Sequence, residues 1–199
     1  MDGKALFGLL ALALGLVAQI SYLVGMSHGK TRPNPISWLA WSVMMTVMTI
    51  VIFSEGAGPA AWPGAIQAVF QVTVCILAFR WGGRRDIKRS DLICLAAAAV
   101  AFGFWAVADQ AEIAVILISS AGFFGWLPTI RKAWRKPFEE ATVMWSIDIV
   151  KLSVCTAAIE YYSFATVFNQ ALWIGLNLIT VSVVLVRRRV MRKVKSYVS

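Results

Sequence analysis

Seven blocks of mostly apolar residues, separated by short polar connections, constrain the fold of this chain more than any other feature. Each block approaches or reaches the roughly 17–25 residues that a helix needs to cross a bilayer. Seven helices of about 20 residues would occupy roughly 140 positions, which leaves too little of the 199 residues for a soluble domain. The sequence therefore predicts an all-α integral membrane protein with seven transmembrane helices. The expected spans are residues 5–26, 36–53, 61–79, 92–108, 113–130, 141–159 and 164–186.

The composition points the same way. The chain is 59% hydrophobic and 15% charged, whereas an ordinary soluble domain is about 45–50% apolar and about 25% charged. This argues against a secreted enzyme, a nucleic-acid-binding module and a disulfide scaffold. Cys75, Cys94 and Cys155 lie inside apolar blocks without CxxC spacing, so we expect small core residues and no metal site. The sequence has no HExxH or GxSxG motif, so we expect neither an enzyme nor a cofactor.

The net charge of +9 is concentrated in short runs beside the apolar blocks, and this predicts the orientation of the chain. Basic connections at 27–35, 80–91 and after the fifth span, together with the basic tail, alternate with connections whose charges are acidic: Glu55, Asp109 with Glu112, and Glu160. Short connections rich in Lys and Arg stay cytoplasmic. We therefore expect a cell-membrane protein with its N-terminus outside and its C-terminus in the cytoplasm. The runs, which include Arg84 and Arg85, are read as topology signals and contacts with membrane lipids, not with nucleic acid.

Matching residues in the two halves of the chain suggest an internal repeat. Trp38 opens the second block and Trp145 opens the sixth, 107 positions later, while Gln71 and Asn177 lie 106 positions apart. Two three-helix units can face the same way only if one extra helix joins them. The sequence thus predicts a 3+1+3 arrangement of parallel repeats. The expected parts are a first three-helix bundle at 1–82, a linker helix at 83–110, a second three-helix bundle at 111–188 and a basic cytoplasmic tail at 189–199.

The segment from Leu127 to Glu140, which begins Leu-Pro-Thr-Ile-Arg-Lys, resembles the PQ-loop motif near the end of a repeat's first helix. The whole chain resembles the PQ-loop/SWEET superfamily of small-solute transporters. Thr129 stands where the motif has Gln, and Gln19 in the first repeat follows Ala18 and not Pro. Pro128 is the one hinge proline of the SWEET kind, so the resemblance implies the fold but not a sugar substrate.

Asp148 and Lys151 are the ionisable pair expected within a span. Charged groups inside a bilayer are costly and commonly mark transport or coupling sites. Residues three apart share one helical face and can pair. Two readings stay open: a proton- or substrate-linked carboxylate, or a fixed ion pair that joins helix six to its neighbours. Some PQ-loop relatives use a membrane-embedded Asp for proton coupling, so the resemblance favours the first reading without excluding the second.

Amide and indole side chains inside the spans are the candidate ligands of a polar solute. Inter-helix hydrogen bonding explains many such amides, and packing explains many such indoles. SWEET-like proteins place amides of the third and seventh helices at the substrate, which puts Gln71 and Asn177 first. The candidate substrate-binding residues are Gln71, Asn177, Gln67, Trp145, Trp41, Trp173 and Gln19. Trp38, Trp62, Trp81 and Trp134, near span ends, are expected to be interface anchors.

The basic connection after the fifth span is a candidate cytoplasmic gate. Its hinge and gate residues are Pro128, Arg131, Lys132, Glu139 and Glu140; a solvated, topology-setting loop is the alternative. The expected function is a transporter or facilitator of a small polar metabolite, working by alternating access between two three-helix bundles. The alternative on the same fold is a non-transporting receptor or ligand- or lipid-binding protein. The chain can act as a monomer or as a homo-oligomer.

Overall fold

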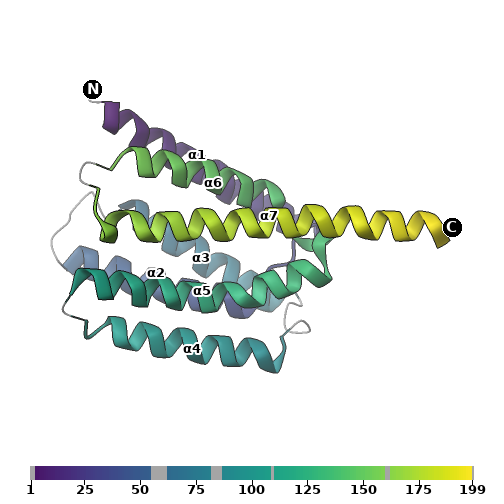
Figure 1. Cartoon of the computed structure of the whole chain (residues 1–199), viewed down its shortest axis with the longest axis horizontal. Helices are drawn as coiled ribbons and strands as arrows, with labels where there is room; N and C mark the ends of the chain where they lie inside the picture. The colour runs from purple at the N-terminus through teal and green to yellow at the C-terminus, as the bar shows by residue number, and fades with distance from the viewer. Residues whose placement is uncertain (1–2, 55–61, 82–86, 109, 160–161, 199) are drawn as a thin grey trace. The chain divides into compact units, whose positions relative to one another are not determined.

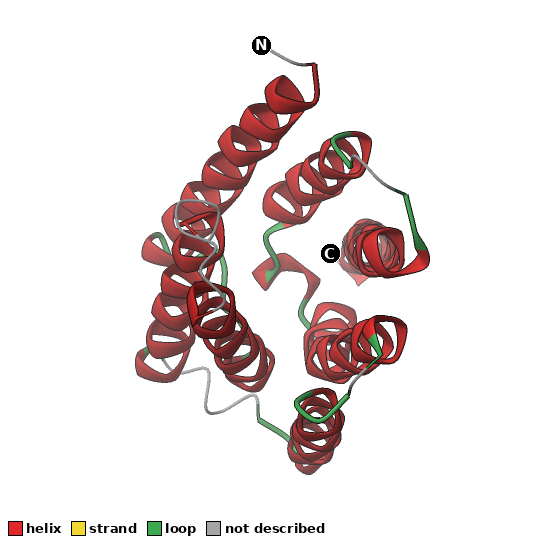
Figure 2. Ribbon diagram, turned by 90° about the vertical axis from the view of Figure 1, so that its left-hand side faces the viewer, coloured by secondary structure: helices red, strands yellow, loops and turns green. Residues whose placement is uncertain are grey.

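The chain is all-helical in the ranges that its structure, a computed structural model, describes: residues 3–54, 62–81, 87–108, 110–159 and 162–198. Figure 2 shows helices and connecting loops there and no strand. The elements are α1 (Gly3–Ser27), α2 (Pro35–Ser54), α3 (Trp62–Arg80), α4 (Arg89–Trp105), α5 (Ala111–Arg135), the 3₁₀ turn η3 (Pro137–Glu139), α6 (Thr142–Ala157) and α7 (Phe164–Val198). The seven expected helices are confirmed. Glu55, Arg84, Arg85, Asp109 and Glu160, on which the predicted charge alternation partly rests, lie outside the described residues.

Two helices end later than expected. The expected fifth span stops at residue 130, but α5 continues to Arg135, so Arg131 and Lys132 are helical and do not lie in a loop. The tail expected at 189–199 is helical as well, because α7 runs to Val198. Basic side chains near a helix C-terminus are stabilised by the helix dipole. In Figure 1 the yellow end of α7 runs past the turn between α5 and α6.

Local signals explain where helices begin and end. Asn34 accepts hydrogen bonds from the backbone N–H groups of Ile36 (2.9 Å) and Ser37 (3.3 Å), so it caps the first turn of α2. Pro35 follows at the first helical position, where its missing N–H costs nothing. At the end of α1, Gly29 has φ +67°, the left-handed conformation that favours glycine after a helix.

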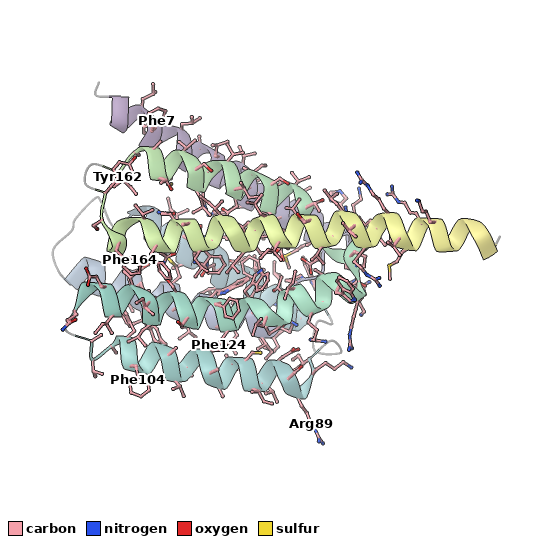
Figure 3. All side chains as sticks on the ribbon, in the orientation of Figure 1. Phe7, Arg89, Phe104, Phe124, Tyr162 and Phe164 are labelled. Carbon is pink, nitrogen blue, oxygen red and sulfur yellow. The ribbon has the colours of Figure 1, made fainter. Side chains whose placement is uncertain are left out.

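Large aliphatic side chains face outward on several helices, while small residues face inward. On α1, residues Ala11, Gly15 and Ala18 are buried, whereas Leu9, Leu16 and other long side chains are exposed. On α4, Ala98 and Ala101 are buried, and Ile93 is 70% exposed. Figure 3 labels the exposed Phe7 of α1 and Phe104 of α4. A helix of a water-soluble protein buries its large apolar side chains. On α1 and α4 the large apolar side chains are exposed and the small residues are buried, so the usual burial pattern is reversed.

Two segments of the described chain, Leu6–Ser27 and Val167–Lys193, are long and apolar enough to cross a membrane. Pro35–Ile50 and Gly64–Arg80 are shorter apolar helical segments. Length and composition thus mark α1 and α7 as candidate spans, and the other helices are not marked by this criterion.

The helices form two compact units. One unit comprises residues 1–31 and 130–199, and the other comprises residues 32–129. In the first unit α6 packs against both α1 and α7. In the second, α2 packs against α3 and α4, and Ala40, Ala98, Ala101 and Ala121 form a core of small residues from α2, α4 and α5. The units combine helices from both halves of the sequence, so their limits differ from those of the expected parts at 1–82, 83–110 and 111–188. The expected parts describe an internal duplication of the sequence, and this duplication stays a prediction.

Candidate functional site

Asp148 is the centre of a polar cluster in the first unit. On α6, the Lys151 ammonium pairs with Oδ1 of Asp148 across one turn. From α7, Asn177 donates a hydrogen bond from Nδ2 to Oδ2 of Asp148, at 2.9 Å. The structure therefore brings together three residues that the sequence marks as candidates, and both carboxylate oxygens have partners.

The orientation of the Asn177 amide leaves one acceptor available. Its NH₂ group must face Asp148, because the reversed amide would set two oxygen acceptors against each other. Asn177 is fully buried, and its Oδ1 has no hydrogen-bond partner among the described residues. Buried polar atoms nearly always have a partner. This oxygen therefore has an unused acceptor position among the described residues.

Gly15 of α1 lies against the stem of Lys151. A Cβ atom at position 15 would be 3.3 Å from Cδ of Lys151, which is tighter than ordinary contact. The glycine lets α1 approach the lysine closely, and its neighbours along the same face, Ala11 and Ala18, are small and buried too. Gly15 was not predicted to be a site residue, because a lone glycine in an apolar helix does not indicate which side chain packs against it.

A second charged cluster lies where α5 meets η3 and α6. Lys132 Nζ is 2.8 Å from Oε1 of Glu140 and 3.9 Å from Oε2 of Glu139. The side chains of Lys132 and Glu140 are each only 2% exposed. These contacts join three of the candidate gate residues, and burial makes the Lys132–Glu140 pair a fixed part of the turn in this structure. Whether the turn opens as a gate stays a prediction.

Arg188 of α7 forms three hydrogen bonds with this turn and with the start of α6. Its guanidinium donates to the backbone oxygens of Pro137 (2.9 Å) and Glu140 (2.8 Å) and to the hydroxyl of Thr142 (3.3 Å). Three acceptors on one guanidinium fix the last part of α7 to the loop between α5 and α6. Nothing in the local sequence around Arg188 indicates which carbonyl groups its guanidinium contacts.

The expected meeting of Gln71 with Asn177 and Asp148 stays a prediction. Gln71 and Gln67 lie on α3 in the second unit, and Asn177 lies in the first. Gln71 is half-buried, and its Oε1 has no hydrogen-bond partner among the described residues. Gln19 on α1 is half-buried.

The tryptophans correct one expectation. Trp38 is not an interface anchor: it is 3% exposed and packs edge-to-face on Trp41 and Phe70, with ring centroids 5.3 and 5.6 Å away. It follows the capped start of α2, so it enters the core immediately. Trp81 and Trp134 are exposed, and the side chain of Trp62 lies outside the described residues.

Among the candidate solute ligands, Trp41 is buried and its indole Nε1 donates to the backbone oxygen of Gly122, at 3.2 Å. Trp145 is buried as well, and Trp173 is half-buried. The contact of Trp41 with α5 favours the packing interpretation for this residue. Solute stacking on Trp145 or Trp173 stays a prediction.

Two polar contacts of the second unit were missed by sequence reasoning. Asp91 is buried at the start of α4, where its Oδ2 accepts hydrogen bonds from the Lys88 backbone (3.0 Å) and from Asn34 Nδ2 (3.5 Å). The Asn-Pro pair before an apolar block was the available signal for a helix cap. Thr129, directly after the buried Pro128 inside α5, donates to Ser37 at 2.8 Å.

The structure gives no metal site among the described residues, since no three of their His, Cys, Asp and Glu side chains are grouped to hold an ion. The polar cluster of Asp148, Lys151 and Asn177 is the best-formed candidate site, because each of its charged groups has a partner.

No family model, no curated protein and no solved structure matches this chain.

Proposed function

We propose that this chain is a seven-span membrane protein that carries a small polar solute across the cell membrane. The main support for membrane insertion is the reversed burial of α1 and α4, which expose large aliphatic side chains and bury alanine and glycine. Without a hydrophobic driving force between helices, membrane helices associate through small residues. Continuous exposed apolar surface of this kind is rare on monomeric soluble proteins. By this proposal the N-terminus is outside and the C-terminus is cytoplasmic.

The single observation that carries the transport proposal is the cluster of Asp148, Lys151 and Asn177. Ionisable residues in membrane helices are costly and are kept where they serve transport or coupling. The cluster combines a carboxylate, an ammonium group and a free amide oxygen within one pair of helices. These groups suit a solute with hydroxyl or amine donors. Protonation of Asp148 would remove the charge that pairs with Lys151, which would link solute movement to protons.

Helix spacing supports the parallel-repeat organisation that we propose. α1 and α5 are both 25 residues long, begin at positions 3 and 111, and end at positions 27 and 135. Both ends are therefore 108 residues apart. α2 and α6 begin at positions 35 and 142, which is 107 residues apart. A duplicated unit resembling the PQ-loop/SWEET repeat would have this spacing, and alternating access of its two copies would move the solute.

Uptake by proteoliposomes tests the proposal. The purified full-length protein would be reconstituted and assayed with labelled sugars, amino acids, nucleosides and vitamins, with and without a pH gradient. We expect at least one solute to accumulate, and Asp148→Asn and Asn177→Ala to reduce its uptake at least tenfold. Asp148→Asn should also abolish any effect of the gradient.

The matched control is Ser153→Ala on the same helix, because Ser153 Oγ donates only to the carbonyl of Ile149, one turn earlier. Wild-type uptake in both Asp148→Asn and Asn177→Ala would remove the site assignment. Binding of a solute without exchange across the membrane would replace transport by the receptor or ligand-binding alternative.

A further inference from the structure

Three arginines of α7 lie on two aromatic rings at the turn between α5 and α6. The Arg187 guanidinium carbon is 4.7 Å from the centre of the Trp134 ring, and its Nε donates to the Trp134 backbone oxygen at 3.0 Å. Arg188 and Arg192, one turn apart, each have their guanidinium carbon 5.7 Å from the centre of the Phe138 ring. Cation–π contacts of this kind orient the guanidinium groups. We call these five residues the arginine surface.

The Glu140 carboxylate acts on the charge of Arg188, but Arg187 and Arg192 have no carboxylate partner among the described residues. Arg188 donates to two backbone oxygens and one hydroxyl, all of them neutral. The two nearby acids, Glu139 and Glu140, pair with Lys132. The sequence also has no Asp or Glu after Glu160. Like charges held together in this way favour a bound anion.

The position of the arginine surface along α7 indicates which anion. The uninterrupted apolar sequence of α7 ends at Val186; Arg187 and Arg188 follow directly and Arg192 follows one turn later, all near the end of the candidate span Val167–Lys193. Trp134 and Phe138 are 54% and 48% exposed, and tryptophan is enriched at the boundary between lipid and water. Figure 3 shows side chains with blue nitrogen atoms gathered around this part of α7. Phosphate groups of lipids lie at this depth, and arginine binds phosphate through paired N–H donors.

We propose that the arginine surface binds the phosphate headgroup of an acidic phospholipid in the cytoplasmic leaflet. Arg187 and Arg192 supply the charge, Trp134 and Phe138 hold the two guanidinium groups in place and contact the upper acyl chains, and Arg188 fixes α7 to the turn. A bound lipid would fasten the basic end of α7 to the cluster of Lys132 and Glu140. The inference rests on the proposed membrane insertion but not on transport.

Native mass spectrometry of the full-length protein in neutral detergent tests this site. The protein would be titrated with dioleoylphosphatidylglycerol, and with dioleoylphosphatidylcholine as the neutral-headgroup reference. We expect tighter binding of phosphatidylglycerol, and about fivefold weaker binding of it for Arg187→Gln and for Arg192→Gln. Arg189→Gln is the matched control, since Arg189 is an exposed neighbour on the same helix, and its effect should stay below twofold. Phe138→Ala, which keeps every charge, should also weaken binding.

Several results would overturn the proposal. An equal loss for Arg189→Gln would mean a diffuse positive field and no defined site. Equal binding of the two lipids would remove the selectivity for an acidic headgroup. Displacement of phosphatidylglycerol by millimolar inorganic phosphate would identify a free anion as the ligand. Asp148→Asn should leave lipid binding unchanged, so a failure of solute uptake and a failure of lipid binding are separate outcomes.

Discussion

Asn177 on α7 and Asp148 on α6 are joined by a hydrogen bond of 2.9 Å between Nδ2 and Oδ2. The same carboxylate pairs with Lys151 through its other oxygen. The two helices are therefore linked by a hydrogen bond to a charged carboxylate as well as by packing. Measuring the stability of suitable variants can separate the contribution of the charges from that of side-chain packing.

Asp148→Ala is expected to lower stability, because it leaves Lys151 without its carboxylate and Asn177 without its acceptor. Removing one partner of a fully buried pair costs about 3–5 kcal/mol. Both side chains are partly exposed, at 20% and 23%, so we expect a loss of roughly 1–3 kcal/mol. The double variant Asp148→Leu/Lys151→Met should recover the part of the loss that comes from the unpaired Lys151 charge, whereas the part that comes from Asn177, which lacks its acceptor in both variants, should remain. Thermal unfolding in mild detergent measures both, and an equal loss in the single and double variants would contradict the charge-pair argument.

Gly125→Ala is expected to destabilise the second unit. A Cβ at this position would lie 3.0 Å from Nε1 of Trp41 and 3.2 Å from Cβ of Ala40. The displaced indole would also weaken its hydrogen bond to Gly122. Overpacking of this kind costs about 1–3 kcal/mol, which should appear as a lower midpoint of thermal unfolding.

Gly103→Ala on α4 is the matched control for that substitution, because a Cβ there meets nothing within 4 Å. Alanine is a better helix former than glycine by about 1 kcal/mol. This variant should therefore be as stable as the wild type or slightly more stable. If both alanine variants lose stability equally, close contact between α2 and α5 is not the cause of the loss.

The helices were predictable from the sequence because each apolar block is long enough to act as a local signal. Their ends were less predictable: α7 continues to Val198 and α5 to Arg135, through basic residues that looked like loops and a tail. The extended parts make contacts such as Arg187 with Trp134 and Arg188 with the Pro137 carbonyl. Such contacts join residues about 50 positions apart, and no local pattern encodes them.

The candidate site was predictable where a polar residue interrupts an apolar block. Asp148, Lys151 and Asn177 stand out for this reason, and their mutual contacts follow from helix spacing and from the packing of α6 on α7. Gly15 and Trp38 show the limit of the method. Whether a small or aromatic residue is buried depends on which helix packs against it. The pattern of apolar residues along one helix does not identify that neighbouring helix.

Lys132→Met is expected to be the most destabilising single change at the turn between α5 and α6. It leaves the Glu140 carboxylate without its ion-pair partner. In the wild type, Lys132 Nζ lies 2.8 Å from Glu140 Oε1, and both side chains are only 2% exposed. A loss of about 3–5 kcal/mol is expected for a pair buried this deeply. Arg135→Gln, an exposed change near the end of the same helix, should stay within about 0.5 kcal/mol. Unfolding midpoints that fall equally in the two variants would show that the turn does not depend on the buried pair.

Asn34 combines a helix cap with a link to Asp91, and substitutions separate the two roles. Asn34→Ala removes both and should cost roughly 1–2 kcal/mol. Asn34→Ser keeps the cap and loses only the 3.5 Å contact with Asp91, so it should cost less. Asn34→Asp keeps the cap but sets a second carboxylate against Asp91, so it should be less stable than the serine variant. The order of the three unfolding midpoints tests this, and a serine variant as unstable as the alanine variant would contradict the capping role.

Cysteine labelling tests the proposed topology. In a background with Cys75, Cys94 and Cys155 replaced by alanine, His28→Cys and Tyr162→Cys each place one thiol at an exposed position in a connection. The connection after α1 carries Lys30 and Arg32 and is expected in the cytoplasm, whereas position 162 lies in the connection whose charge is Glu160, which is expected outside. Intact cells should therefore label position 162 with a membrane-impermeant maleimide, and position 28 should label only after permeabilisation. Because an odd number of spans separates these two positions in a seven-span chain, labelling of both from the same side would contradict the seven-span topology directly.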